Sequence, residues 1–276
     1  MLVASAFVLV VASPVMRSPA AVIFLHGSGD TGPGVQGYLR HVWSGRFPEK
    51  MAKASVDVLY PSATPIPYTL ARGQVMSIWY DRYKLSPAGR EHTESIEASC
   101  ARLEAIVDEL VASGLQPERI AIGGFSMGGG IALQMALRSK RRLGGVFALS
   151  SYMCTDAAVY ERYELTAEAT VSTRPPIFMR HGDADRFIAP AWGVATAERL
   201  KGLGFDVNAA LLPGVAHEMV DGELEELAEW VLAALGVTRT APDAMRAAES
   251  MDPALQGWSC DDCPQRSVVR TIRVRR

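Results

Sequence analysis

Six short runs of apolar residues recur along the chain, and longer stretches whose apolar positions return every three or four residues separate them. Short apolar runs are typical of strands buried on both faces of a sheet, whereas the longer spacing is typical of covering helices. The runs are 22–25, 56–60, 120–124, 145–149, 177–180 and 207–212. Because strands and helices alternate, the pattern predicts an α/β fold with a mostly parallel central sheet flanked by helices.

Two helices can be delimited from this pattern. The first is expected over 91–113 and is followed by Gly114, a residue that commonly ends helices. Asp221 is expected to cap the second helix, which ends at Gly236. Their apolar faces are Ile96, Cys100, Leu103, Val107 and Leu110, and Leu224, Leu227, Ala228, Val231 and Leu235. The periodicity then fades, so we expect one domain over 1–237 and a partly disordered C-terminal extension over 238–276.

Two long stretches, 61–90 and 152–175, interrupt the alternation. The first contains an aromatic cluster, Trp79, Tyr80 and Tyr83. Long loops in compact domains often line a ligand site, but these stretches could equally be surface excursions whose aromatic side chains fill the core. The sequence does not choose between the two interpretations.

Composition and charge exclude several classes of protein. The chain has 276 residues, of which 49% are hydrophobic and 21% charged, and its net charge is −2. These values are typical of a globular protein and provide no basic field for nucleic acid. Five arginines lie within 266–276, and we interpret this tail as a solvated terminus. The longest apolar run, 2–12, is too short to span a bilayer, so no stable membrane anchor is expected.

The cellular location is predicted from the N-terminus and the cysteines. Residues 2–12 resemble a strand more than a secretory signal, because no Lys or Arg precedes them. The cysteines are Cys100, Cys154, Cys260 and Cys263. Only the last two are close together, and a single C-D-D-C lacks the second half of a zinc site. We therefore expect reduced thiols, no metal and a cytoplasmic protein, with secretion as the alternative.

The clearest chemical signal lies at 124–128, which read G-F-S-M-G between an apolar run and a helical pattern. A G-x-S-x-G sequence in this context is typical of a nucleophile elbow, where a sharp turn exposes the serine hydroxyl above the sheet. The pentapeptide also arises by chance, so the strand before it and the helix after it carry the interpretation. The sequence thus predicts Ser126 as a nucleophile.

A serine nucleophile needs a base and an orienting acid, which in such folds follow it in the order Asp or Glu, then His. His26, His41 and His92 precede Ser126, and His181 lies within a predicted strand. Only His217 follows in a loop from which an imidazole can reach back. The candidate acids are Asp183 and Asp185, with Asp156 as a weaker third, and spacing alone does not decide among them.

An oxyanion hole requires two backbone N–H groups, one of which belongs to the residue after the nucleophile, Met127. The loop within 22–34 supplies the second, for which Ser28 is the candidate, beside Gly27. A phosphate-binding loop is disfavoured there, because no Lys follows the glycines and their spacing fits neither the dinucleotide-binding nor the Walker pattern.

Five tracts together resemble the acyl-protein thioesterase/lysophospholipase branch of the α/β-hydrolases, the phospholipase/carboxylesterase family, over about 5–235. They are F-L-H-G-S-G-D-T-G at 24–32, W-Y-D-R at 79–82, G-G-F-S-M-G-G at 123–129, H-G-D-A-D at 181–185 and A-H-E at 216–218. Met127 in place of the usual Gln, together with W-Y-D-R-Y-K, is similar to the lysophospholipase-like protein 1 subgroup.

The resemblance implies a role for each site residue. It implies Ser126 as the nucleophile, Asp185 as the acid and His217 as the base, with no metal or cofactor. The oxyanion donors are then Ser28 and Met127, and the candidate substrate-binding residues are Gly27, Trp79 and Asp81.

We therefore expect 1–237 to be the catalytic domain of a serine hydrolase that cleaves esters or thioesters through an acyl-enzyme. Small esters, lysolipids and S-acylated proteins all fit as substrates, and Met127 together with the subgroup resemblance favours short acyl chains. The alternatives are a non-catalytic binding module on the same fold, a long-chain protein depalmitoylase and a serine peptidase. The last is disfavoured because no large gating domain is present.

Overall fold

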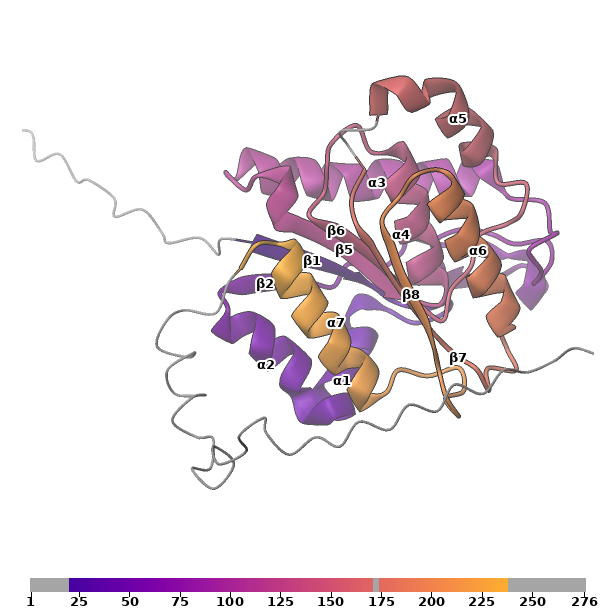
Figure 1. Ribbon diagram of the computed structural model, residues 1–276. Coiled ribbons are helices and arrows are strands. Elements are labelled where there is room, and N and C mark those ends of the chain that lie inside the picture. The colour runs from indigo at the N-terminus through magenta and orange to yellow at the C-terminus, as the bar shows by residue number, and fades with distance from the viewer. Residues whose placement is uncertain (1–19, 171–173, 238–276) are drawn as a thin grey trace, which may run out of the picture. The chain divides into compact units, whose positions relative to one another are not determined.

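The computed structural model describes residues 20–170 and 174–237. Six strands form one sheet in the order β2-β1-β5-β6-β7-β8, and every neighbouring pair runs parallel (Figure 1). They are β1 (Ala20–Leu25), β2 (Val56–Leu59), β5 (Ile120–Phe125), β6 (Gly145–Leu149), β7 (Ile177–Gly182) and β8 (Val207–Leu212). The predicted fold class is confirmed, and each predicted apolar run coincides with a strand to within two residues.

Helices cover both faces of this sheet (Figure 1). On one face lie α1 (Gly32–His41), α2 (Arg46–Lys53) and α7 (Asp221–Ala234), and on the other α3 (Thr93–Ala112), α4 (Met127–Arg138), α5 (Ala158–Thr170) and α6 (Pro190–Gly202). In β1, Val22 and Phe24 pack into one apolar cluster while Ile23 and Leu25 pack into the other. Because both faces of the four inner strands, β1, β5, β6 and β7, are buried, these strands appear as continuous apolar runs rather than as alternating patterns.

The two predicted helices are present, but one predicted cap is wrong. Val220 is the N-cap of α7, and Asp221 is its first residue. The Asp221 carboxylate instead accepts a hydrogen bond from the backbone N–H of Trp43, 2.6 Å away. It still lies at the positive end of the helix dipole, which a negative charge stabilises. Gly236 follows the helix with a φ of +62°, as its position after the last apolar residue predicts.

Both stretches predicted to be irregular contain regular structure. The first holds an antiparallel hairpin of β3 (Pro65–Tyr68) and β4 (Gln74–Ser77), and the second holds α5. Proline is tolerated in so short a two-stranded ribbon, which hid the hairpin from the sequence pattern. Three short 3₁₀ turns complete the secondary structure at Val42–Gly45, Thr69–Ala71 and Pro117–Arg119.

The strand order places a topological switch point at the carboxyl edge of the sheet. The chain moves from β1 to β2 on one side and then to β5 on the other side of β1. The loops after β1 and β5 therefore diverge, and such a point is where open α/β sheets bind ligands. The loops after β6, β7 and β8 begin at the same edge, because all six strands are parallel.

Several predictions concern parts of the chain outside the described residues. These are the strand-like run 2–12, the extension 238–276 with its basic tail, and the pair Cys260 and Cys263. The division between 237 and 238 therefore stays a prediction. Cys100 and Cys154, which are described, are free thiols. Within the described ranges, no helix is both long and apolar enough to cross a membrane.

Candidate active site

Ser126 occupies a tight turn between β5 and α4. Its φ of +53° lies in the left-handed region, which non-glycine residues adopt at an energetic cost. A β-carbon at Gly124 or Gly128 would lie 2.2 Å or 2.3 Å from the carbonyl oxygen of Leu25. Both positions require glycine because the end of β1 passes directly against the turn. The strand, turn and helix that a nucleophile elbow needs are thus all present.

His217 reaches Ser126 from the loop between β8 and α7. Its Nε2 lies 3.1 Å from Ser126 Oγ, and its Nδ1 lies 2.7 Å from Asp185 Oδ2. A carboxylate only accepts, so Nδ1 carries the proton and Nε2 is free to accept from the serine hydroxyl. The imidazole packs against the rings of Phe125 and Phe187, with centroids 4.7 Å and 5.1 Å away, which hold its plane.

Asp185 follows β7, and its side chain is completely buried. Its Oδ1 accepts hydrogen bonds from the backbone N–H groups of Phe187 and Ile188, both at 2.8 Å. Burial alone would raise the pKa of Asp185, but the hydrogen bonds from Ile188, His217 and Phe187 outweigh it and bring the pKa below its usual value. The carboxylate is therefore ionised near neutral pH.

The other two candidate acids lie elsewhere. Asp183 accepts a hydrogen bond from the backbone N–H of Gly214, 2.7 Å away, and so ties the end of β7 to the loop that leads to His217. Asp156 is exposed and lines a separate pocket with Gly89 and Thr93. Of the three aspartates, Asp185 is the one that the fold brings to the imidazole.

The proposed oxyanion donors flank Ser126. Met127 is the first residue of α4, and N–H groups in the first turn of a helix have no partner within the helix. Its side chain is fully buried in the core, so Met127 offers the site its backbone alone. On the other side, a β-carbon at Gly27 would lie 3.7 Å from the Ser126 β-carbon. The loop that continues into Ser28 therefore lies directly beside the nucleophile candidate.

A set of hydrogen bonds fixes this loop from behind. The indole Nε1–H of Trp79 donates to the carbonyl of His26 at 2.9 Å, and the backbone N–H of Ala63 donates to His26 Nε2 at 2.9 Å. Burial lowers the pKa of His26 despite the opposing hydrogen bond to Gly27, which keeps Nε2 available as an acceptor. The N–H of Gly29 adds a bond to the carbonyl of Ser77, 3.0 Å long.

Two predicted substrate-binding residues are engaged in internal contacts. Trp79 is 1% exposed, and its ring N–H is used to hold the loop at His26. The carboxylate of Asp81 accepts hydrogen bonds from the backbone N–H and the hydroxyl of Thr69 and from the N–H of Arg82. In this structure both residues support the backbone around the site.

Sequence reasoning missed two supporting residues. His181 was set aside because it lies in a strand, yet its Nε2–H donates to the carbonyl of Ile188 at 2.9 Å and lies 3.3 Å from Asp185 Oδ2. The hydroxyl of Ser151 donates to the carbonyl of Ser126. The H-G-D-A-D tract at 181–185 hinted at the first contact, but no sequence signal pointed to the second.

The described residues contain no group of three or more His, Cys, Asp or Glu side chains that could hold a metal ion. The polar groups gathered here are one hydroxyl, one imidazole, one carboxylate and free N–H groups. Such a set can activate an oxygen nucleophile and stabilise a developing oxyanion.

Comparisons with known proteins extend over most of the chain. The family model described as Phospholipase/Carboxylesterase matches residues 7–234. Lysophospholipase-like protein 1 of Mus musculus is 38% identical over 225 residues, which cover 82% of this chain and 91% of that protein. Acyl-protein thioesterase 1 of Gibberella zeae is 35% identical over 213 residues, or 75% and 87% of the two chains. The crystal structure of Arabidopsis thaliana SOBER1 has a TM-score of 0.69 at 26% identity and covers 78% of this chain and 99% of its own.

The hydrogen bond from Trp79 to the loop can be tested by Trp79→Phe. We expect the free energy of unfolding to fall by about 1–3 kcal/mol, because the carbonyl of His26 loses its donor inside the core. Urea denaturation measures the change. Trp230→Phe is the matched control, since its indole packs on Phe178 and donates no hydrogen bond within the described residues. Equal losses in the two variants would contradict a specific role for the Trp79 N–H.

Proposed function

The chain belongs to the phospholipase/carboxylesterase family and is a hydrolase of the α/β-hydrolase fold, and we propose that it cleaves esters or thioesters through an acyl-enzyme on Ser126. One observation carries this proposal. Ser126 Oγ, the His217 ring and the Asp185 carboxylate form a continuous hydrogen-bonded chain with links of 3.1 Å and 2.7 Å. A binding module without catalysis would not need this chain across three separate loops.

In the proposed mechanism His217 accepts the Ser126 proton as Oγ attacks the carbonyl carbon of the substrate. The N–H groups of Ser28 and Met127 stabilise the resulting oxyanion, and His217 then donates its proton to the leaving group. A water molecule, activated by the same imidazole, attacks the acyl-enzyme and releases the carboxylic acid. The reaction returns Ser126 and His217 to their starting protonation states.

Asp185 supports both steps through its charge. Its hydrogen bond fixes the tautomer that leaves Nε2 unprotonated, and its ionised carboxylate stabilises the imidazolium that forms during attack. The side chain of His217 is 20% exposed, whereas that of Asp185 has no exposure. Substrate and water can thus approach the imidazole, while the charge that orients it stays in a low-dielectric environment.

The substrate proposal combines the relatives and the packing around Ser126. The relatives are named for acyl-protein and lysophospholipid substrates, so we propose an acyl ester or thioester of a small molecule, lysolipid or protein. Short acyl chains are favoured, because the Met127 side chain is fully buried in the core and would have to move for a long acyl chain to pass it. A long-chain depalmitoylase remains the alternative, since a flexible methionine can move aside. We also propose a cytoplasmic location, which the free thiols of Cys100 and Cys154 support.

The effects on kcat of removing the nucleophile and of removing the base should not be additive. We expect Ser126→Ala and His217→Ala each to lower kcat by several orders of magnitude, and the double variant to be little worse than either. Steady-state hydrolysis of a small acetyl ester measures the effect. The exposed His41→Ala is the control and should match the wild type. A phosphonate probe should label Ser126 in the wild type and in His41→Ala but not in the other variants. Losses in kcat that multiply in the double variant would argue against a shared unit.

The two neighbouring aspartates should differ sharply. We expect Asp185→Asn to reduce kcat by about 10⁴-fold, because the amide favours the wrong imidazole tautomer. Asp183→Asn should cost far less, since its role is the hydrogen bond to the N–H of Gly214. Both rates come from the same ester assay, with circular dichroism to confirm folding. The opposite ranking would overturn the assignment of the acid.

Acyl chain length tests the substrate proposal. A long tunnel would gain about 0.8 kcal/mol for each buried CH₂, so kcat/KM would climb steadily with chain length. We expect the climb to stop early and short esters to be cleaved better than palmitoyl ones. The measurement is kcat/KM from acetyl to palmitoyl, each below its aggregation concentration. An unbroken rise would instead place the protein with the depalmitoylating enzymes.

A further inference from the structure

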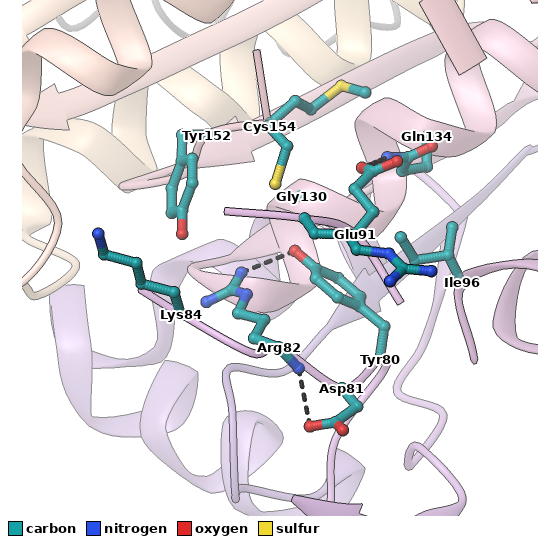
Figure 2. Close-up of a pocket in the computed structure, with 12 residues that line it drawn as sticks. Tyr80, Asp81, Arg82, Lys84, Glu91, Ile96, Gly130, Gln134, Tyr152 and Cys154 are labelled. Atoms are coloured by element: carbon teal, nitrogen blue, oxygen red, sulfur yellow. Dashed lines mark hydrogen bonds between the residues drawn. The ribbon is translucent and has the colours of Figure 1, made fainter. Parts of the chain in front are cut away.

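A second polar recess lies beside the site, around Arg82 (Figure 2). One guanidinium nitrogen donates to the hydroxyl of Tyr80 at 2.7 Å. The same group lies over the rings of Tyr80 and Tyr152, at 4.9 Å and 5.3 Å from their centroids. Figure 2 shows the guanidinium between the two tyrosine hydroxyls, with the Lys84 side chain on the side of Tyr152. The triad does not use any of these groups.

The charge of Arg82 is not neutralised by the protein. Within the described residues Arg82 makes no ion pair, although two acidic residues line the same recess. The carboxylate of Asp81 is directed to Thr69 and to the backbone N–H of Arg82. Glu91 accepts from the side chain of Gln134 and from the N–H of Ala158. A half-buried guanidinium without a counter-charge is partly desolvated, and an anion that entered the recess would offset that cost.

The remaining lining suits the oxygen atoms of an anion. The hydroxyl of Tyr152 has no hydrogen-bond partner within the part of the chain that the structure describes. Burial raises the pKa of Tyr152 to about 12 against the opposing effect of Arg82, so this hydroxyl keeps its proton and can donate. Lys84 and Arg90 add two further cationic side chains to the lining. The enclosed part of the recess measures about 20 Å³, which admits a protruding oxygen atom of an anion but not an acyl chain, so the rest of a bound anion would stay at the open side.

The recess is close to Ser126. Gly130, which lines it, lies one turn further along α4 and donates its N–H to the carbonyl of Ser126 at 3.2 Å. Tyr152 follows Ser151, whose hydroxyl also donates to that carbonyl. Four residues of helix correspond to about 6 Å of rise. The lining therefore comes within about one helical turn of the Ser126 backbone, although it includes no residue of the triad.

We propose that this recess, formed by Arg82, Tyr80 and Tyr152 with Lys84 and Arg90, is a binding site for a small anionic group, a carboxylate or a phosphate. The guanidinium presents a fork of donors that matches two oxygens of either group, and the Tyr152 hydroxyl supplies another donor. The anionic group comes either from the substrate or from a free anion, and the two sources share this chemistry. The binding site stands on its own geometry, while the substrate source rests on the proposed function.

Binding is tested first without hydrolysis, on the full-length chain. The melting temperature is measured against increasing inorganic phosphate, and separately acetate, with sodium chloride at matched ionic strength as reference. Ligands that bind the folded state raise the melting temperature as their concentration rises. The melting temperature of the wild type should rise more than that of Arg82→Gln at each concentration. The general effect of the salt on stability is the same for both proteins, so the difference between them reports binding. Arg141→Gln, which removes a surface arginine paired with Asp108, should behave as wild type.

A second variant guards against misfolding of Arg82→Gln. Tyr152→Phe retains the charge and loses one donor, so its gain should lie below that of wild type. Equal gains for wild type, Arg82→Gln and Tyr152→Phe would overturn the proposal. If Arg82→Gln does not fold, equal increases in melting temperature for wild type and Tyr152→Phe would by themselves overturn the proposal.

Kinetics then identify the source of the anionic group. A neutral acetyl ester is compared with an ester whose acyl chain ends in a carboxylate. If the group belongs to the substrate, Arg82→Gln should lower kcat/KM for the acidic ester by about tenfold or more relative to the neutral one. If Arg82→Gln lowers kcat/KM equally for the two esters while phosphate still raises the melting temperature more in the wild type, the recess binds a free anion. A phosphate effect without hydrolysis of either ester would sink the proposed function and leave the anion site standing.

Discussion

The site depends on one close approach of two backbones, that of the end of β1 to the turn at Ser126. The carbonyl of Leu25 leaves no room for a β-carbon at Gly124 or at Gly128, so strand and turn meet without side chains between them. This contact brings the loop after β1 against one side of Ser126 and the N-terminus of α4 against the other. The proposed oxyanion donors, the N–H groups of Ser28 and Met127, belong to these two segments.

The strained conformation of Ser126 is held by its neighbours. Its φ of +53° is costly for a residue with a side chain, and such strain persists only where the surroundings determine it. The N–H of Ser126 donates to the carbonyl of Leu149 at 2.8 Å, and the hydroxyl of Ser151 donates to the carbonyl of Ser126. Strand β6 and the residues after it thus fix both the N–H and the carbonyl of Ser126, the proposed nucleophile.

Two charges, the buried Asp185 carboxylate and the half-buried Arg82 guanidinium, differ in how the protein compensates them. The negative charge of Asp185 receives hydrogen bonds from two backbone N–H groups and from His217, with the N–H of His181 also near. The guanidinium of Arg82 donates to one tyrosine hydroxyl and lies over two tyrosine rings. A fully compensated anion can orient an imidazole through many turnovers, whereas an uncompensated cation favours the entry of a ligand. The two charges therefore suit different tasks.

The sequence by itself determined the parallel sheet and singled out the proposed nucleophile and base. Buried parallel strands appear as apolar runs, and the glycines around Ser126 record a local steric demand, so both can be seen in short stretches of chain. His217 was identified because it was the only histidine in a loop after Ser126. These inferences needed no knowledge of which segments touch. For the same reason the hairpin at 65–77 and helix α5, whose local patterns are weak, were missed.

The tertiary structure alone decided what depends on contacts between distant segments. Asp183 and Asp185 lie in the same turn and have the same chemistry, and only the path of the chain brings one of them to an imidazole 32 residues away. The sequence left open whether Trp79 lines a ligand site or fills the core, and packing turned its N–H to the loop after β1. The charge of Arg82 is notable only because no carboxylate of the described chain folds onto it. Local sequence encodes backbone periodicity and steric demand, whereas the partner of a side chain is set when the whole sheet assembles.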